Sequence, residues 1–142
     1  MFILACCGLF SALIFCSKIF PTEPEEFRKM EIHYSESDGF GGATSRLDIF
    51  GDGTIQSGSK QGILTTVQQD SLIQLFGNFS QYDPNYSPEF SNPHGDYHTI
   101  DYIYEGKSKS VTVYDPSEAN IPESLQNIIT YLDDLRSKVI SQ

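Results

Sequence analysis

Alternation of apolar and polar side chains predicts five β-strands in this chain. Over residues 31–35, Ile32 and Tyr34 fall on one side and polar residues fall on the other, which is the period of a strand with one buried face. The same alternation predicts four further strands, over residues 46–50, 54–57, 98–104 and 109–115. Gly51-Asp52-Gly53 and Glu105-Gly106-Lys107 stand between paired strands and predict tight turns, because such residues readily adopt positive φ.

A period of three to four residues predicts two helices. The first has apolar residues at Leu72, Leu75, Phe76 and Phe79, and Thr66-Val67-Gln68-Gln69 ahead of them matches a capping box. The second is predicted to start near Pro122, since proline suits a first helical turn. Its apolar positions are Ile121, Leu125, Ile128, Leu132, Leu135 and Val139. Residues 58–62 and 78–96 are predicted to be loops.

These elements predict an α+β fold in the order β-β-β-α-β-β-α. Strands joined as hairpins form an antiparallel sheet, and two amphipathic helices must bury their apolar faces on one side of it. A chain of 142 residues is the size of one domain. We therefore expect a single α+β domain over residues 30–142, and we expect it to be a monomer.

The first twenty residues differ in composition from the rest. Residues 2–20 are apolar or small apart from Lys18, which is typical of a signal or anchor segment. Ile3-Leu4-Ala5-Cys6 resembles a lipobox, and Leu13-Ile14-Phe15-Cys16 is a second candidate, so Cys6 and Cys16 are candidate lipidation sites. We expect export to the periplasm, the membrane or the medium, with the segment cleaved, lipidated or retained. Residues 21–29 are predicted to form a polar tether.

The net charge and the absence of several motifs exclude some classes of function. The chain has 19 acidic and 9 basic side chains, a net charge of −10, which excludes a nucleic-acid-binding surface of the usual basic kind. The sequence has no Gly-x-Ser-x-Gly motif, no His-Glu-x-x-His motif, no Walker loop and no dinucleotide-binding fingerprint. Residues 17–142 contain no cysteine. His94, Asp96 and His98 form the one cluster of ligand-type residues, and we interpret them as part of a loop entering a strand. We therefore expect neither enzyme activity, nor a cofactor, nor a metal.

The loop over residues 37–42 is the candidate binding element. It places one aromatic residue, Phe40, among Gly39, Gly41 and Gly42. Glycines permit tight turns and close approach by another surface, and an exposed phenylalanine there would suit a contact with a partner protein. The alternative is that Phe40 folds under the hairpin and joins the core.

Several segments together resemble emfourin-like proteins, which are bacterial inhibitors of thermolysin-type (M4) metallopeptidases such as protealysin. The matching segments are Ser37-Asp38-Gly39-Phe40-Gly41-Gly42, residues 72–79, Gly95-Asp96-Tyr97 with Tyr102, Val111-Thr112-Val113, and residues 121–135. The resemblance covers about residues 30–136 and implies a protein-binding domain that inhibits a secreted metallopeptidase. Asp38 stands where the family often has glycine. The apolar leader and the Gly51-Asp52-Gly53 turn resemble instead uncharacterised bacterial lipoprotein domains. That alternative implies a membrane-tethered envelope domain with a structural or ligand-binding role, in which only the N-terminal segment meets the membrane.

Overall fold

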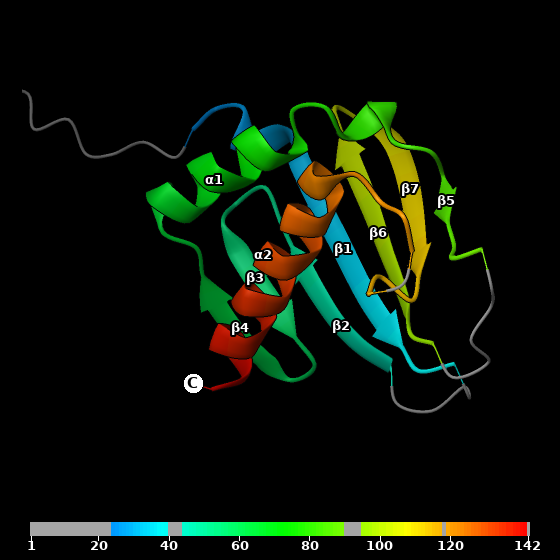
Figure 1. Cartoon of the computed structure of the whole chain (residues 1–142). Helices are drawn as coiled ribbons and strands as arrows, with labels where there is room; N and C mark the ends of the chain where they lie inside the picture. Colours follow the sequence, from blue (N-terminus) through cyan, green and yellow to red (C-terminus); the bar gives the residue numbers. More distant parts are fainter. Residues whose placement is uncertain (1–23, 40–43, 90–94, 118, 142) are drawn as a thin grey trace, which may run out of the picture.

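The computed structural model of the chain describes residues 24–39, 44–89, 95–117 and 119–141. Two short 3₁₀ helices and two α-helices accompany a mixed sheet of seven strands, so the fold is α+β (Figure 1). In chain order the elements are η1 (Phe27–Lys29), β1 (Met30–Ser37), β2 (Thr44–Ile49), β3 (Thr54–Ser57), β4 (Lys60–Ile63), α1 (Thr66–Phe76), η2 (Phe79–Gln81), β5 (Asn85–Tyr86), β6 (Tyr97–Tyr104), β7 (Lys107–Tyr114) and α2 (Glu123–Ile140).

The strand order across the sheet is β4-β3-β2-β1-β6-β7-β5. Strand β1 lies in the centre, antiparallel to both β2 and β6. The two predicted loops, residues 58–62 and 78–96, and the prediction of a purely antiparallel sheet were wrong. Residues 58–62 are not all loop, because β4 pairs with β3, and the predicted loop 78–96 contributes both η2 and β5. Because β5 pairs in parallel with β7, the sheet is mixed rather than purely antiparallel.

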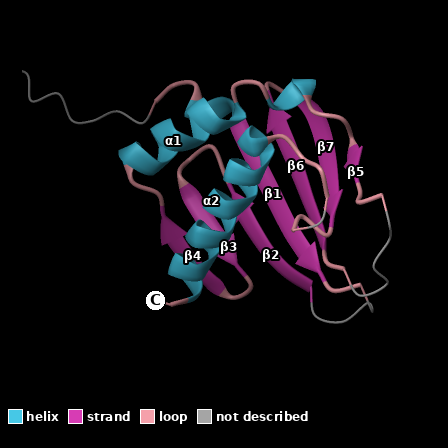
Figure 2. Cartoon of the chain, in the orientation of Figure 1, coloured by secondary structure: helices cyan, strands magenta, loops and turns pink. Residues whose placement is uncertain are grey.

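Both α-helices lie on the same side of the sheet (Figures 1 and 2). That face of the sheet is apolar and almost fully buried, with Ile32, Tyr34, Leu47, Ile49, Ile55, Ile100, Val111 and Val113 at 2% exposure or less. Helix α2 meets it with the predicted stripe of Leu125, Ile128, Leu132, Leu135 and Val139. The opposite face is polar, as the alternation predicted: His33 Nδ1 lies 2.6 Å from Asp48 Oδ1, and Arg46 Nε donates to the same oxygen at 2.8 Å.

The ends of α1 differ from the prediction. The helix is capped by Thr65 rather than Thr66: the Thr65 side chain accepts a hydrogen bond from Gln68 N, and the Gln68 side chain bonds back to Thr65 N. The capping box is therefore real but lies one residue earlier. Helix α1 ends at Phe76, and Phe79 lies in η2, where it is completely buried and 4.9 Å from Phe76 between ring centres.

Both predicted turns are present. Glu105 and Gly106 have φ of 49° and 77° and join β6 to β7, as expected when both central residues of a hairpin turn need positive φ. The β2–β3 turn also fixes the start of the domain, because Gly51 packs against backbone there. A Cβ at Gly51 would lie 2.4 Å from the Arg28 carbonyl oxygen, so no larger residue fits without moving η1.

Phe27 lies within the segment predicted to be a polar tether, yet its side chain is completely buried. The packed domain therefore includes η1. Among the described residues no helix has the length and apolar character needed to cross a membrane. The lipidation candidates Cys6 and Cys16 and the predicted signal or anchor segment lie outside the described residues.

Candidate functional site

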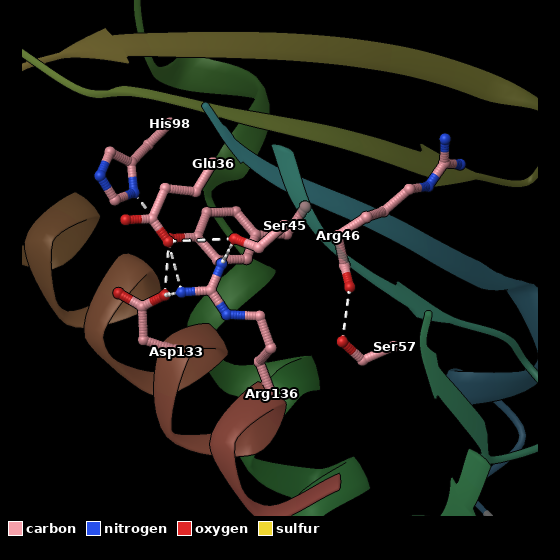
Figure 3. A network of polar contacts seen from close by, with 8 residues as sticks. Glu36, Ser45, Arg46, Ser57, His98, Asp133 and Arg136 are labelled. Carbon is pink, nitrogen blue, oxygen red and sulfur yellow. Dashed lines mark hydrogen bonds and ion pairs between the residues drawn. The ribbon is translucent and has the colours of Figure 1, made fainter. Parts of the chain in front are cut away.

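A network of polar side chains joins α2 to β1 and β2 at one end of the sheet (Figure 3). Its central residue is Arg136 of α2, whose side chain is 13% exposed. Arg136 Nη2 donates hydrogen bonds to Glu36 Oε2 at 2.5 Å and Asp133 Oδ1 at 2.8 Å. Nη1 donates to Ser45 Oγ at 2.5 Å, and the guanidinium carbon lies 5.4 Å from the centre of the Tyr34 ring. These contacts offset the free-energy cost of removing the guanidinium from water.

Tyr34 extends the network to a third strand. Its hydroxyl donates to Asp133 Oδ1 at 2.8 Å and lies 2.6 Å from Nδ1 of His98 on β6. A tyrosine hydroxyl has one proton, and here Asp133 receives it. Nδ1 of His98 must therefore carry a proton and donate it to the Tyr34 oxygen. The Tyr34 hydroxyl therefore fixes the orientation of the buried His98 ring.

The contact with Arg136 determines the direction in which the pKa of the Glu36 carboxyl is shifted. Burial alone would raise its pKa, but the hydrogen bond and the positive charge of Arg136 outweigh burial, and His98 and Ser45 add to them. The pKa of Glu36 is therefore lowered from its usual 4.5. The carboxylate is ionised at neutral pH and holds Arg136 between the helix and the sheet.

The network does not resemble a catalytic set. Burial, followed by the nearby Asp133 carboxylate, raises the pKa of the Tyr34 phenol, whereas a nucleophile or a base needs a lowered one. Each polar atom described above contacts another member of the network. The described residues contain no group of three or more His, Cys, Asp and Glu side chains that could hold a metal ion. The arrangement is therefore suited to fixing the positions of backbone segments.

The segment that it fixes is the base of the β1–β2 hairpin. Glu36 and Ser45 are directly opposite each other in the sheet, and Ser37 and Thr44 form the last pair of the hairpin. Arg136 therefore bonds to one side chain from each strand, one pair before the connecting loop. On the far side of β2, Ser57 Oγ donates to the Arg46 carbonyl oxygen at 2.8 Å, so β3 also holds this end (Figure 3).

The predicted contact loop begins where this network ends. Gly39 is described and follows the last residues of β1, whereas Phe40, Gly41 and Gly42 lie outside the described residues. The candidate metal cluster is only partly described. His94 lies outside the described residues, while His98 points to Tyr34 beneath α2.

Arg136, Glu36, Ser45 and Asp133 were missed by the reasoning from sequence. A signal for two of them was present. Glu36 has the same strand phase as Ile32 and Tyr34, and Arg136 follows Leu132 by four residues and precedes Val139 by three. A charged residue of opposite sign on each buried face predicts an ion pair between the two elements.

Comparison with known protein families and with curated proteins finds no match to this chain. The resemblance to emfourin-like proteins therefore rests on the quoted segments alone.

Proposed function

We propose that this chain is a non-enzymatic protein-binding domain, with the loop between β1 and β2 as its contact element. Gly39, Phe40, Gly41 and Gly42 make the contact, and Phe40 is the principal residue. The target class implied by the resemblance is a secreted thermolysin-type metallopeptidase, which the domain inhibits. The leader delivers the domain to the compartment where such an enzyme is found.

One observation carries the proposal, namely the bonds of Arg136 to Glu36 and Ser45 at the base of the hairpin. A loop ordered only on binding loses affinity to its own conformational entropy. Fixing both strands immediately before the loop reduces that loss, because the two ends of the loop are already held in place. A partly buried Arg–Glu pair at this position is therefore useful to a binding loop.

Charge supports the same function. Residues 21–142 contain all 19 acidic side chains and 8 of the 9 basic ones, so their net charge is −11. Such a field raises the association rate with a partner whose surface is positive. It acts mainly on the rate of encounter, while the loop determines the rate of dissociation.

The test is inhibition of thermolysin by the full chain and by the variant Phe40→Ala. We expect the parent to inhibit and the variant to lose about 30-fold in affinity, the effect of removing a hot-spot residue worth about 2 kcal/mol. Ile63→Ala is the matched control, because Ile63 is an exposed apolar residue, at 72% exposure, on the edge strand β4. It should inhibit as well as the parent.

Urea unfolding of the same variants separates a contact residue from a core residue. Phe40→Ala should change the free energy of unfolding by less than about 0.5 kcal/mol if Phe40 faces a partner. A loss of about 3–5 kcal/mol would place Phe40 in the core and contradict the proposal. Equal inhibition by the parent and Phe40→Ala, or no inhibition by the parent, would also contradict it.

A further inference from the structure

A cavity of about 550 Å³ lies at the other end of the helix-covered face. Strand β1 shows the separation, because Met30 at its start pairs with Tyr104 while Glu36 near its end pairs with His98. Small-molecule sites in proteins have volumes of about 300–1,000 Å³ and mostly apolar walls. This cavity has that size, and its walls come from the start of β1 and from α1, η2, β6 and β7.

The inner wall is apolar and aromatic. Met30 and Phe76 are buried core residues, and Ile73 and Tyr102 pack against the same core. The rings of Phe76 and Tyr102 lie 5.0 Å apart between centres. A ligand on this wall would gain free energy by covering apolar surface, in proportion to the area it removes from water.

The outer rim is positively charged. Lys107 and Lys109 of β7 both line the cavity, and they share a face of the sheet with Tyr104 and Tyr102, their partners on β6. Within the described part of the chain, neither lysine has an acidic side chain within 4.0 Å. On a chain of net charge −10, two cations without acidic partners beside an apolar cavity indicate a place for an anion.

The lining contains one acid, Glu26, and it is already paired. The Tyr104 hydroxyl donates to its carboxylate, and Lys29 Nζ lies 3.3 Å from Oε1. The hydrogen bond from Tyr104 and then the contacts with Lys29 lower the pKa of Glu26. Lys29 Nζ also lies 3.2 Å from Glu105 Oε1, so Glu26, Lys29 and Glu105 pair among themselves. The cations that line the cavity without an acidic partner among the described residues are Lys107 and Lys109.

We propose that this cavity binds an amphiphilic organic anion, a compact apolar chain or ring that ends in a carboxylate or a phosphate. The apolar part lies on the partly exposed Ile73, Tyr102 and Tyr104, above the buried Met30 and Phe76. The anionic group pairs with Lys107 and Lys109. This activity is independent of the contact loop, which lies at the other end of β1. Its failure in the test below would leave the inhibition assay unaffected, and the reverse also holds.

The test is an NMR titration of the full ¹⁵N-labelled chain with four ten-carbon probes: decanoate, decyl phosphate, decanol and decylammonium. We expect saturable shifts at the amides of residues 102–109 with at least one of the two anions, and decanol and decylammonium to bind about tenfold or more weakly. Comparison of decanoate with decyl phosphate identifies the preferred head group. Equal binding of the anion and the alcohol, shifts located elsewhere, or no saturation by any anion would overturn the proposal.

Paired substitutions test the role of the lysines. Lys107→Gln with Lys109→Gln should weaken binding of the preferred anion roughly tenfold, since the anionic group then loses both of its charge contacts. Lys60→Gln with Lys138→Gln makes the same change in net charge away from the cavity and should leave the affinity within twofold. Equal losses in the two double variants would show a general charge effect and overturn the assignment. Unchanged thermal unfolding of both confirms that the comparison concerns folded protein.

Discussion

The cations at the two ends of the helix-covered face differ in whether they have acidic partners. At the Arg136 end, one cation contacts two carboxylates, a hydroxyl and an aromatic ring, and its side chain is almost buried. At the cavity end, Lys107 and Lys109 lie beside open apolar volume with no acidic partner among the described residues. A cation of the first kind stabilises the fold, whereas a cation of the second kind is available to a ligand. Four predictions test this distinction.

Substitution of the buried cation should have the largest effect on stability. Arg136→Met leaves Glu36 and Asp133 facing each other without the guanidinium, at a cost of about 2–4 kcal/mol, somewhat less than for a fully buried pair. Urea unfolding followed by circular dichroism measures the change. Lys138→Met is the control on the same helix, since its exposed pair with Asp134 contributes only about 0.5 kcal/mol or less. Equal losses for the two variants would remove the distinction drawn between paired and free cations.

Removal of one hydroxyl should have the next largest effect. Tyr34→Phe keeps the ring but leaves Asp133 and His98 without their shared partner, and we expect a loss of about 1–3 kcal/mol in the free energy of unfolding. Tyr131→Phe on α2 is the control, because the Tyr131 hydroxyl has no hydrogen bond within the described residues. A neutral result for Tyr34→Phe would mean that the network contributes through packing rather than hydrogen bonds.

Acid should weaken the Arg136 end specifically. The pKa of Glu36 is lowered in the folded protein from its usual 4.5, so its stabilising contribution is complete above that pH and is lost as the pH falls through the folded value. The difference in unfolding free energy between the parent and Arg136→Met should therefore shrink as pH falls below about 4.5. Urea unfolding at a series of pH values measures it. A difference that stays constant into the acid range would contradict the pairing.

Substitution of the free cations should have the smallest effect on stability. Lys107→Met and Lys109→Met, made singly, should each change the free energy of unfolding by less than about 0.5 kcal/mol, as for other surface positions without partners. The measurement is the same urea titration. The same change, from a cation to methionine, is thus compared at the Arg136 end and at the cavity end of the helix-covered face. A loss comparable to that of Arg136→Met would mean that these lysines support the fold.

Local patterns predicted most of the fold because the buried face of each element leaves its own period in the sequence. Alternation predicted β1, β2, β3, β6 and β7, and the apolar stripe from Leu125 to Val139 predicted α2. Strand β4 has no alternating pattern of its own, and β5 is two residues long. Both form by pairing with a neighbouring strand, which a local pattern does not record.

The site was harder to predict because its members are far apart in the sequence. Arg136 and Glu36 are 100 residues apart, and Asp133 and Tyr34 are 99 apart. Each looks like an ordinary surface charge or a core aromatic until the strand phase of Glu36 and the helix phase of Arg136 are compared. The cavity gave no signal either, since its walls come from five elements that only the tertiary structure brings together.

The position of Arg136 near the C-terminal end of the last helix also sets an order of events in folding. The bonds at the base of the β1–β2 hairpin need a residue that is synthesised 100 positions after Glu36, and loop closure over that distance comes late. A chain still being synthesised cannot yet have this end of the hairpin fixed by Arg136. The base of the β1–β2 hairpin therefore acquires its bonds to Ser45 and Glu36 only after α2 has docked on the sheet.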